Sequence, residues 1–122
     1  MLSGVGLDFY VANTRGEVLH SEKHVKFEEE LQAFLLEKEG YPAKSFGLLL
    51  NLDQYKDRVF SAREVEELVL ICEELLQEYD IHTERQWEVN ERIRGINAFA
   101  KELKALCLNA LDNSKKVIAL GD

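Results

Sequence analysis

The sequence predicts a single domain of the α+β class, in which a small sheet of three or four strands has about three helices packed on one face. Three observations lead to this prediction. Apolar and polar residues alternate near the N-terminus, which is typical of a half-buried strand. Two long stretches in the second half repeat apolar residues at helical spacing. A short apolar run then follows the second stretch.

Length and composition indicate one folded domain that spans residues 1–122. The chain is 46% hydrophobic and 31% charged, which is typical of a globular protein and not of a disordered one. No linker rich in proline, glycine or serine divides it, and no internal repeat is present. We therefore expect one hydrophobic core.

The first half of the chain predicts a hairpin, a helix and a buried strand. Alternation over 5–12 indicates a strand, the turn-prone residues 13–16 follow it, and 17–20 would return as a second strand. A stripe of apolar residues predicts a helix over 26–38, stopped by Gly40 and Pro42.

A continuous apolar run over 46–50 then favours a buried central strand, and the polar residues 51–58 favour a loop after it.

The second half gives the clearest helical signals. Ser61 and Glu64 have the spacing of a capping box, and the helix that they begin extends to about Tyr79. A further helix begins somewhere between residues 84 and 92 and ends near Asp112. Its apolar residues recur in steps of three and four, which favours antiparallel packing against the preceding helix.

The apolar run over 117–120 predicts a last strand. We expect it to pair near the strand predicted at 46–50, and the sequence leaves its direction open.

Charge limits the kinds of partner. The chain has 23 acidic and 15 basic residues and a formal net charge of −8. This argues against a general affinity for nucleic acid or for an anionic membrane surface, and it would speed the encounter with a basic protein. The apolar runs are too short to span a bilayer, and the N-terminal residues do not have the pattern of a signal peptide. Cys72 and Cys107 lie in helical patterns, so we expect a reduced, cytoplasmic setting.

Few residues have a spacing that indicates chemistry. No phosphate-binding glycine loop, nucleophile elbow or zinc-type cysteine spacing occurs, and we predict no cofactor and no metal. His20 and His24 are four apart but are expected at a strand end and in a loop, where that spacing does not align two ligands. The cysteines are expected in the interface between the two long helices and not as nucleophiles.

Three aspartates could meet at one end of the sheet. Asp53 and Asp57 follow the strand predicted at 46–50, and Asp122 follows the last strand. If these strands are parallel neighbours, the carboxylates could bind a cation or a basic side chain. The alternative is that they are turn aspartates that accept hydrogen bonds from loop N–H groups.

Trp87 is either a partner-binding hot spot or a core residue. The candidate partner-binding residues are Asp53, Tyr55, Asp57, Trp87 and Asp122.

The second half of the chain also resembles a known group of proteins. The matching residues are the segment 52–60, the amphipathic helix after it, the helical residues 104–111 and the closing Val-Ile-Ala-Leu-Gly-Asp over 117–122. They resemble small uncharacterised bacterial proteins with an Asp-x-Tyr-x-Asp-x-Val-Phe segment and an apolar C-terminal strand followed by Gly-Asp. Lys56 stands where the group prefers glycine, and Arg58 where it prefers threonine. Some members resemble immunity proteins of bacterial toxin systems, which implies a small acidic α+β binding protein.

These observations lead to one expected function and two alternatives. We expect an acidic, non-enzymatic binding protein, of the immunity type, that neutralises a cationic toxin. The first alternative is a homodimeric accessory or regulatory protein whose interface uses an exposed part of the stripe on the last helix. The second alternative is a small metal-dependent hydrolase that uses the cluster of Asp53, Asp57 and Asp122.

Overall fold

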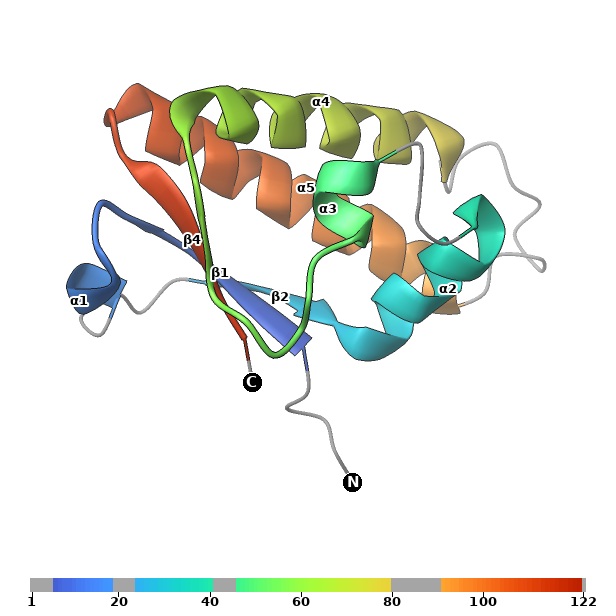
Figure 1. The fold of residues 1–122 in the computed structure, drawn as a ribbon. Coiled ribbons are helices and arrows are strands. Elements are labelled where there is room, and N and C mark those ends of the chain that lie inside the picture. The colour runs from blue at the N-terminus through green and yellow to red at the C-terminus, as the bar shows by residue number, and fades with distance from the viewer. Residues whose placement is uncertain (1–5, 19–23, 41–45, 80–90, 122) are drawn as a thin grey trace.

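The computed structural model describes residues 6–18, 24–40, 46–79 and 91–121 (Figure 1). The helices and strands follow in the order β1 (Gly6–Ala12), α1 (Arg15–Val18), β2 (Val25–Glu28), α2 (Glu29–Glu39), α3 (Gly47–Leu50), β3 (Arg58–Phe60), α4 (Ala62–Glu78), α5 (Glu91–Asp112) and β4 (Lys116–Leu120). The predicted α+β class is confirmed: helices α2 to α5 cover one face of a four-stranded sheet, and α1 lies against the other.

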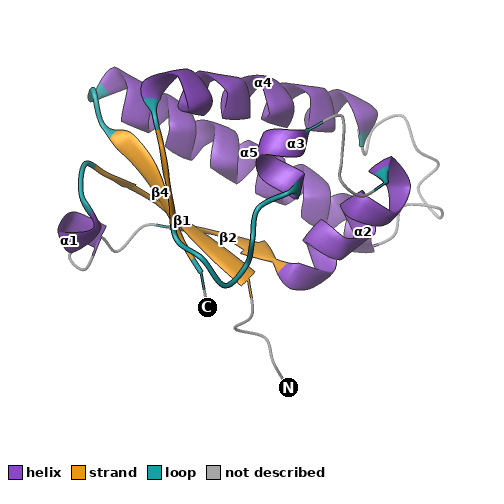
Figure 2. Cartoon of the chain, viewed as in Figure 1, coloured by secondary structure: helices purple, strands orange, loops and turns teal. Residues whose placement is uncertain are grey.

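The sheet is antiparallel throughout, with the strand order β2-β1-β4-β3 (Figure 2). The strand predicted at 5–12 and the strand predicted at 117–120 are both present, as β1 and β4, and they are the two central strands. They pair with each other, so Phe9 lies opposite Ala119 and Tyr10 lies opposite Ile118.

Side chains alternate between the two faces of the sheet, as strand geometry requires. Leu7 and Phe9 of β1 point into the main core under the helices, where both are fully buried or nearly so. Ala12 of β1 and Ile118 of β4 point the other way and contact Val18 of α1. The second, smaller apolar cluster therefore holds α1 against the outer face of the sheet.

The two long helices have the predicted form. Helix α4 begins with the predicted capping box, in which the Glu64 N–H donates to the Ser61 hydroxyl and the Ser61 N–H donates to the Glu64 carboxylate. Helix α5 lies antiparallel beside it, because Lys104 contacts Glu73 while Asn97, a turn or two earlier, contacts Tyr79. The apolar stripe of α5 is buried in the core; its fully buried members are Ile96, Ala100, Leu103, Cys107 and Ala110.

The predicted second strand is wrong at residues 17 and 18, whereas its residues 19 and 20 lie outside the described ranges. The predicted start of the next helix is also wrong. Residues Arg15–Val18 form helix α1, and β1 pairs instead with β2 at Val25–Glu28. The helix predicted over 26–38 begins only at Glu29. Val25 and Phe27 alternate into the core, and the Phe27 ring stacks on Phe99 with centroids 4.5 Å apart. The spacing of Phe27 and the following apolar residues also fits a helix. Burial of both Val25 and Phe27, two residues apart, favours the extended backbone of a strand instead.

The strand predicted at 46–50 is also wrong. Gly47–Leu50 is the short helix α3, and Leu49 and Leu50 are fully buried in it. A short apolar run does not distinguish a buried strand from a buried helical turn, because both need apolar side chains on every side. The edge strand β3 lies partly within the residues predicted as a loop, and β4 pairs with β1 and β3, antiparallel to both.

Candidate partner-binding surfaces

Three of the five predicted partner-binding residues lie in the loop between α3 and β3. Asp53, Tyr55 and Asp57 are exposed there. Trp87 and Asp122 lie outside the described residues. The predicted aspartate cluster required two parallel strands that end side by side. The structure does not have them, because 46–50 is not a strand and β4 is antiparallel to its neighbours. Within the described ranges, no group of three or more histidine, cysteine, aspartate or glutamate residues could hold a metal ion.

Both loop aspartates accept backbone hydrogen bonds. The Tyr55 N–H donates to Oδ1 of Asp53 at 2.8 Å, which closes a local turn. The Gly121 N–H donates to Oδ1 of Asp57 at 2.9 Å, which joins the loop to the residue that follows β4. These contacts agree with the alternative interpretation of the sequence, in which the aspartates accept hydrogen bonds from loop N–H groups and so stabilise the loop.

A buried glutamine braces the other end of this loop. Gln32 of α2 is 4% exposed, and its Nε2 donates to the carbonyl oxygens of Leu50 at 3.0 Å and Leu52 at 2.9 Å. Gln54 in turn donates its side-chain N–H to Oε1 of Gln32. Since a buried amide is costly unless its hydrogen bonds are made, this network holds residues 50–54 in one place relative to α2.

Close backbone contact completes the bracing. A Cβ atom added to Gly121 would lie 2.5 Å from the Lys56 backbone nitrogen and 2.6 Å from the Tyr55 carbonyl carbon, so only glycine fits there. These contacts hold the backbone at Tyr55 in place, and the residue is 69% exposed. An exposed tyrosine on a well-held backbone is a typical anchor for a protein partner, because the backbone loses little conformational entropy when it binds.

The outer face of α4 has a second surface that the sequence analysis did not identify. Leu70 is 61% exposed at the middle of the helix. Glutamates occupy the positions three and four residues before it and three and four residues after it, and all are exposed: Glu66, Glu67, Glu73 and Glu74. Residues at these spacings are neighbours on a helix, so four carboxylates surround one apolar side chain. We call these five residues the α4 acidic face.

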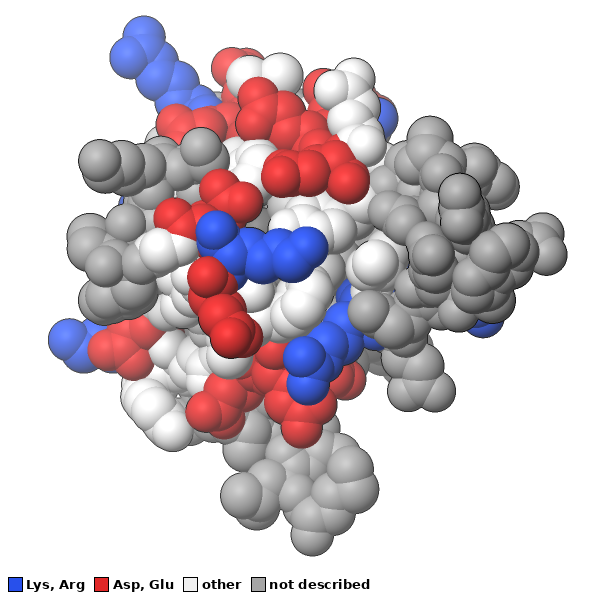
Figure 3. All heavy atoms as spheres, turned by 90° about the vertical axis from the view of Figure 1, so that its right-hand side faces the viewer, with Lys and Arg blue, Asp and Glu red and all other residues white. Residues whose placement is uncertain are grey.

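Most of these carboxylates are free of ion pairs. Glu73 contacts Lys104 of α5 at 3.2 Å, and no cation of the described part of the chain pairs with Glu66, Glu67 or Glu74. Over its whole length α4 has six glutamates and one arginine. Figure 3 views the molecule from the end at which α4 finishes, and carboxylates gather along its top, where the long helices lie. This helix therefore carries a large part of the net negative charge.

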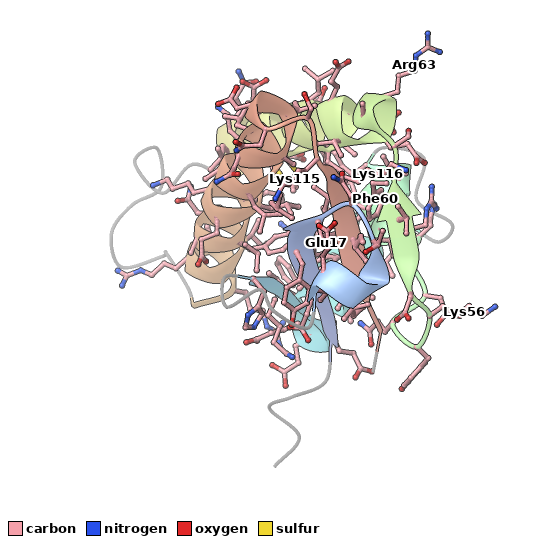
Figure 4. The ribbon with its side chains drawn as sticks, turned by 90° about the vertical axis from the view of Figure 1, so that its left-hand side faces the viewer. Glu17, Lys56, Phe60, Arg63, Lys115 and Lys116 are labelled. Carbon is pink, nitrogen blue, oxygen red and sulfur yellow. The ribbon has the colours of Figure 1, made fainter. Side chains whose placement is uncertain are left out.

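The loop before β3 and the start of α4 carry cations instead. The Arg58 side chain pairs with Glu64 and lies over the Phe60 ring, 5.1 Å from the centroid. Lys56 and Arg63 have no carboxylate partner among the residues that the structure describes. In Figure 4, Lys56 and Arg63 lie toward opposite ends of this segment and point away from the body of the molecule.

Arg58 and Glu64 also set the protonation of the capping box. The hydrogen bond from the Ser61 backbone lowers the pKa of Glu64, and the nearby Arg58 guanidinium lowers it further, against a smaller opposing effect of burial. Glu64 is therefore held in its charged form as part of the helix start. It differs from the glutamates of the α4 acidic face, which do not cap the helix.

A smaller polar cluster occupies the outer face of the sheet on β1 and β2. The ring of His24 stacks on Tyr10 with centroids 5.3 Å apart, and Asp8 lies 3.4 Å from Nζ of Lys26 and 3.7 Å from Nε2 of His24. Burial and the Asp8 carboxylate raise the pKa of Tyr10, and Lys26 opposes them. These contacts cross the β1–β2 pair and stabilise it. The other histidine predicted nearby, His20, lies outside the described residues.

The two cysteines lie in the core, as predicted from their positions on the helices. Cys72 and Cys107 are fully buried, and burial raises the pKa of each thiol to about 12. A pKa this high disfavours the thiolate, the nucleophilic form, at neutral pH.

Comparison with protein-family models, curated proteins and solved structures finds no match to this chain. In addition, no helix in the described ranges has the length and apolar character to cross a membrane. Inference about function therefore starts from the two surfaces themselves.

Proposed function

We propose that this protein is a non-enzymatic binding protein that docks a basic protein through the α4 acidic face, as an immunity-type protein would bind a cationic toxin. The observation that carries the proposal is the exposed Leu70 with glutamates three and four residues away on both sides. An apolar anchor surrounded by charge is a common arrangement at protein interfaces, because the centre loses water while the rim sets specificity.

The helix that carries this face is well suited to present it. Its opposite side is anchored in the core by fully buried residues, among them Val65, Leu68 and Leu75. Its start is held by the capping box at Ser61. A partner would therefore meet a preformed surface, and little free energy would be lost in ordering it.

Charge complementarity indicates a partner with a basic surface. The carboxylates of Glu66, Glu67 and Glu74 would face lysine and arginine side chains around an apolar pocket that accepts Leu70. Attraction between opposite charges speeds the encounter, and dissolved salt screens it. An acidic protein with a net charge of −8 would show this effect strongly.

The two alternatives from the sequence lack this kind of support. The homodimer alternative relied on an exposed part of the α5 stripe, and the side chains of that stripe are buried or partly buried against the core. The hydrolase alternative relied on an aspartate cluster, and Asp53 and Asp57 instead accept hydrogen bonds from loop N–H groups. Burial raises the pKa of both cysteine thiols to about 12, which disfavours the nucleophilic thiolate form.

Capture from a lysate, followed by association kinetics, tests the proposal. The wild-type protein should retain one basic protein at low salt and release it at high salt. A variant in which glutamine replaces Glu66, Glu67 and Glu74 keeps the shape of the face and removes three charges. We expect it to associate with that partner about tenfold more slowly, since each rim charge contributes a few tenths to 1 kcal/mol.

The matched control removes three charges from another helix, α2, with glutamine in place of Glu29, Glu30 and Glu37. It has the same net charge as the α4 variant, so a general charge effect would slow both proteins equally. Equal rates for the two variants, or a wild-type rate independent of ionic strength, would contradict the proposal.

A further inference from the structure

Strand β3 forms one edge of the sheet, and no described strand pairs with its outer side. Among the described strands it pairs with β4 alone, and the strand order has none of them beyond it. Figures 1 and 4 view this edge from directions 90° apart, and neither shows a described helix or strand beyond it. An open edge presents backbone N–H and C=O groups that a further strand can pair with.

We propose that the open edge of β3 receives an extended, acidic peptide segment of a partner protein as a fifth strand. Addition of a strand to a sheet edge is a general mode of peptide recognition, in which backbone hydrogen bonds supply affinity and alternate side chains supply specificity. This site lies outside the α4 acidic face and selects the opposite charge, so it goes beyond the function proposed above.

The charges around β3 select an anionic strand. Residues 55–63 contain three cations and one carboxylate, in a protein whose net charge is −8. The carboxylate, Asp57, accepts a hydrogen bond from the Gly121 N–H. The cations Lys56 and Arg63 lie near the two ends of the edge and point outward (Figure 4). They would pair with acidic residues of a strand that lies along β3.

The side chains of β3 itself complete the site. Val59 is 43% exposed and lies on the outer face of the sheet, opposite the buried Ile118 of β4. Glu64 holds the Arg58 side chain over the Phe60 ring, so that guanidinium does not cover Val59. An added strand would therefore place an apolar residue beside Val59, and acidic residues toward its two ends would lie near Lys56 and Arg63.

The same charges argue against a second copy of this chain as the occupant. If two β3 edges paired with each other, the cations of one copy would meet the cations of the other, and like charges opposite one another destabilise a strand pair. The other edge of the sheet, β2, lacks this pattern, because Lys26 is paired with Asp8 and Glu28 is an acid. The charges thus favour β3 as the acceptor and an anionic segment as the added strand.

A synthetic peptide tests this directly. The probe is a nine-residue peptide of alternating valine and glutamate with a fluorescent label, and its counterpart has lysine in place of glutamate. We expect saturable binding of the glutamate peptide alone, measured by fluorescence anisotropy. We also expect slower hydrogen exchange when it is bound at those backbone amides of Arg58–Phe60 that point away from β4, since the added strand would pair with them.

Charge reversal at the two free cations should weaken this binding. A double variant, Lys56→Glu with Arg63→Glu, is expected to bind the glutamate peptide about tenfold more weakly, because two exposed attractions become repulsions. The matched control reverses two exposed cations on α5, Arg94→Glu with Lys101→Glu, and has the same net charge. It should bind as the wild type does apart from a small general charge effect.

Three results would overturn the proposal: equal binding of both peptides, equal weakening by both double variants, or binding without slower exchange at β3. Loss of the function proposed above would look different, because glutamine variants of the α4 acidic face should leave binding of this peptide intact.

Discussion

The loop before β3 and the outer face of α4 both carry exposed carboxylates, yet these groups have different roles. Asp53 and Asp57 of the loop each accept a hydrogen bond from a backbone N–H. Glu66, Glu67 and Glu74 of α4 cap no backbone group and pair with no cation in the described ranges. The loop carboxylates are therefore part of the fold, and the helix carboxylates are available to a partner.

The difference follows from the backbone around each group. In the middle of an α-helix every N–H already donates to the carbonyl four residues earlier, so a side-chain carboxylate finds no free backbone donor. In a loop, and at the first turn of a helix, N–H groups are unpaired, and nearby carboxylates accept from them. Glu64, at the start of α4, belongs with the loop aspartates in this respect.

The largest effect should come from the buried amide that braces the loop. We expect Gln32→Leu to lower the free energy of unfolding by about 3 kcal/mol, because the Leu50 and Leu52 carbonyls and the Gln54 side chain lose their partner. Urea unfolding of the variant measures this loss. Glu67→Gln, on the α4 acidic face, is the control and should stay within about 0.5 kcal/mol of the wild type. If both variants lost the same free energy of unfolding, the polar groups that hold the loop would not differ in role from those of the α4 acidic face.

A somewhat smaller effect is expected where the loop meets the end of β4. Gly121→Ala would bring a methyl group to 2.5 Å from the Lys56 nitrogen, so the backbone must move, at a cost of about 2 kcal/mol. Thermal unfolding measures the loss. Gly16→Ala is the matched control, since its methyl group would have only the Thr14 hydroxyl oxygen nearby, at 3.8 Å. If Gly121→Ala were as stable as the control, the loop would not be held as tightly as these contacts indicate.

The smallest effect concerns the pH dependence of the capping box. Because the folded state lowers the pKa of Glu64, its charged form stabilises the fold above the ordinary glutamate pKa of about 4.3, and this contribution disappears as the pH falls through the lower folded-state pKa. Glu64→Gln should therefore cost up to about 1 kcal/mol at pH 7 and almost nothing once the pH is below the lowered pKa of Glu64 in the folded state. Urea unfolding at several pH values measures the difference. A constant gap between the two proteins across this range would show that the carboxylate charge has no part in the cap.

The elements that sequence analysis predicted well are long or strongly patterned. The capping box at Ser61 and Glu64 and the helices around it were predicted, as were the strands that became β1 and β4. The strands predicted wrongly are short, namely residues 17 and 18 of the segment 17–20, whose other residues lie outside the described ranges, and the segment 46–50. Over four or five residues the periods of a helix and a strand cannot be separated, so packing decides between them. Val18 and Leu49, which were predicted in strands, are instead buried in the short helices α1 and α3.

The candidate surfaces divide in the same way. The pattern of glutamates around Leu70 is readable in the sequence, because helical periodicity fixes which residues are neighbours. The role of Asp57 was not readable, because its donor is the N–H of Gly121, distant in the chain. The open edge at β3 depends on its pairing with β4, which is also a contact between distant residues.

By itself, then, the sequence determined the α+β class, the two long helices with their buried stripes, and the acidic character of α4. All of these depend on neighbours within one or two helical turns or on composition alone. Only the tertiary structure decided the strand order, the helical form of 46–50 and the division of the carboxylates into bracing and free groups. The physical reason is that strand pairing and burial join residues far apart in the chain, and local patterns contain no information about which distant segments will meet.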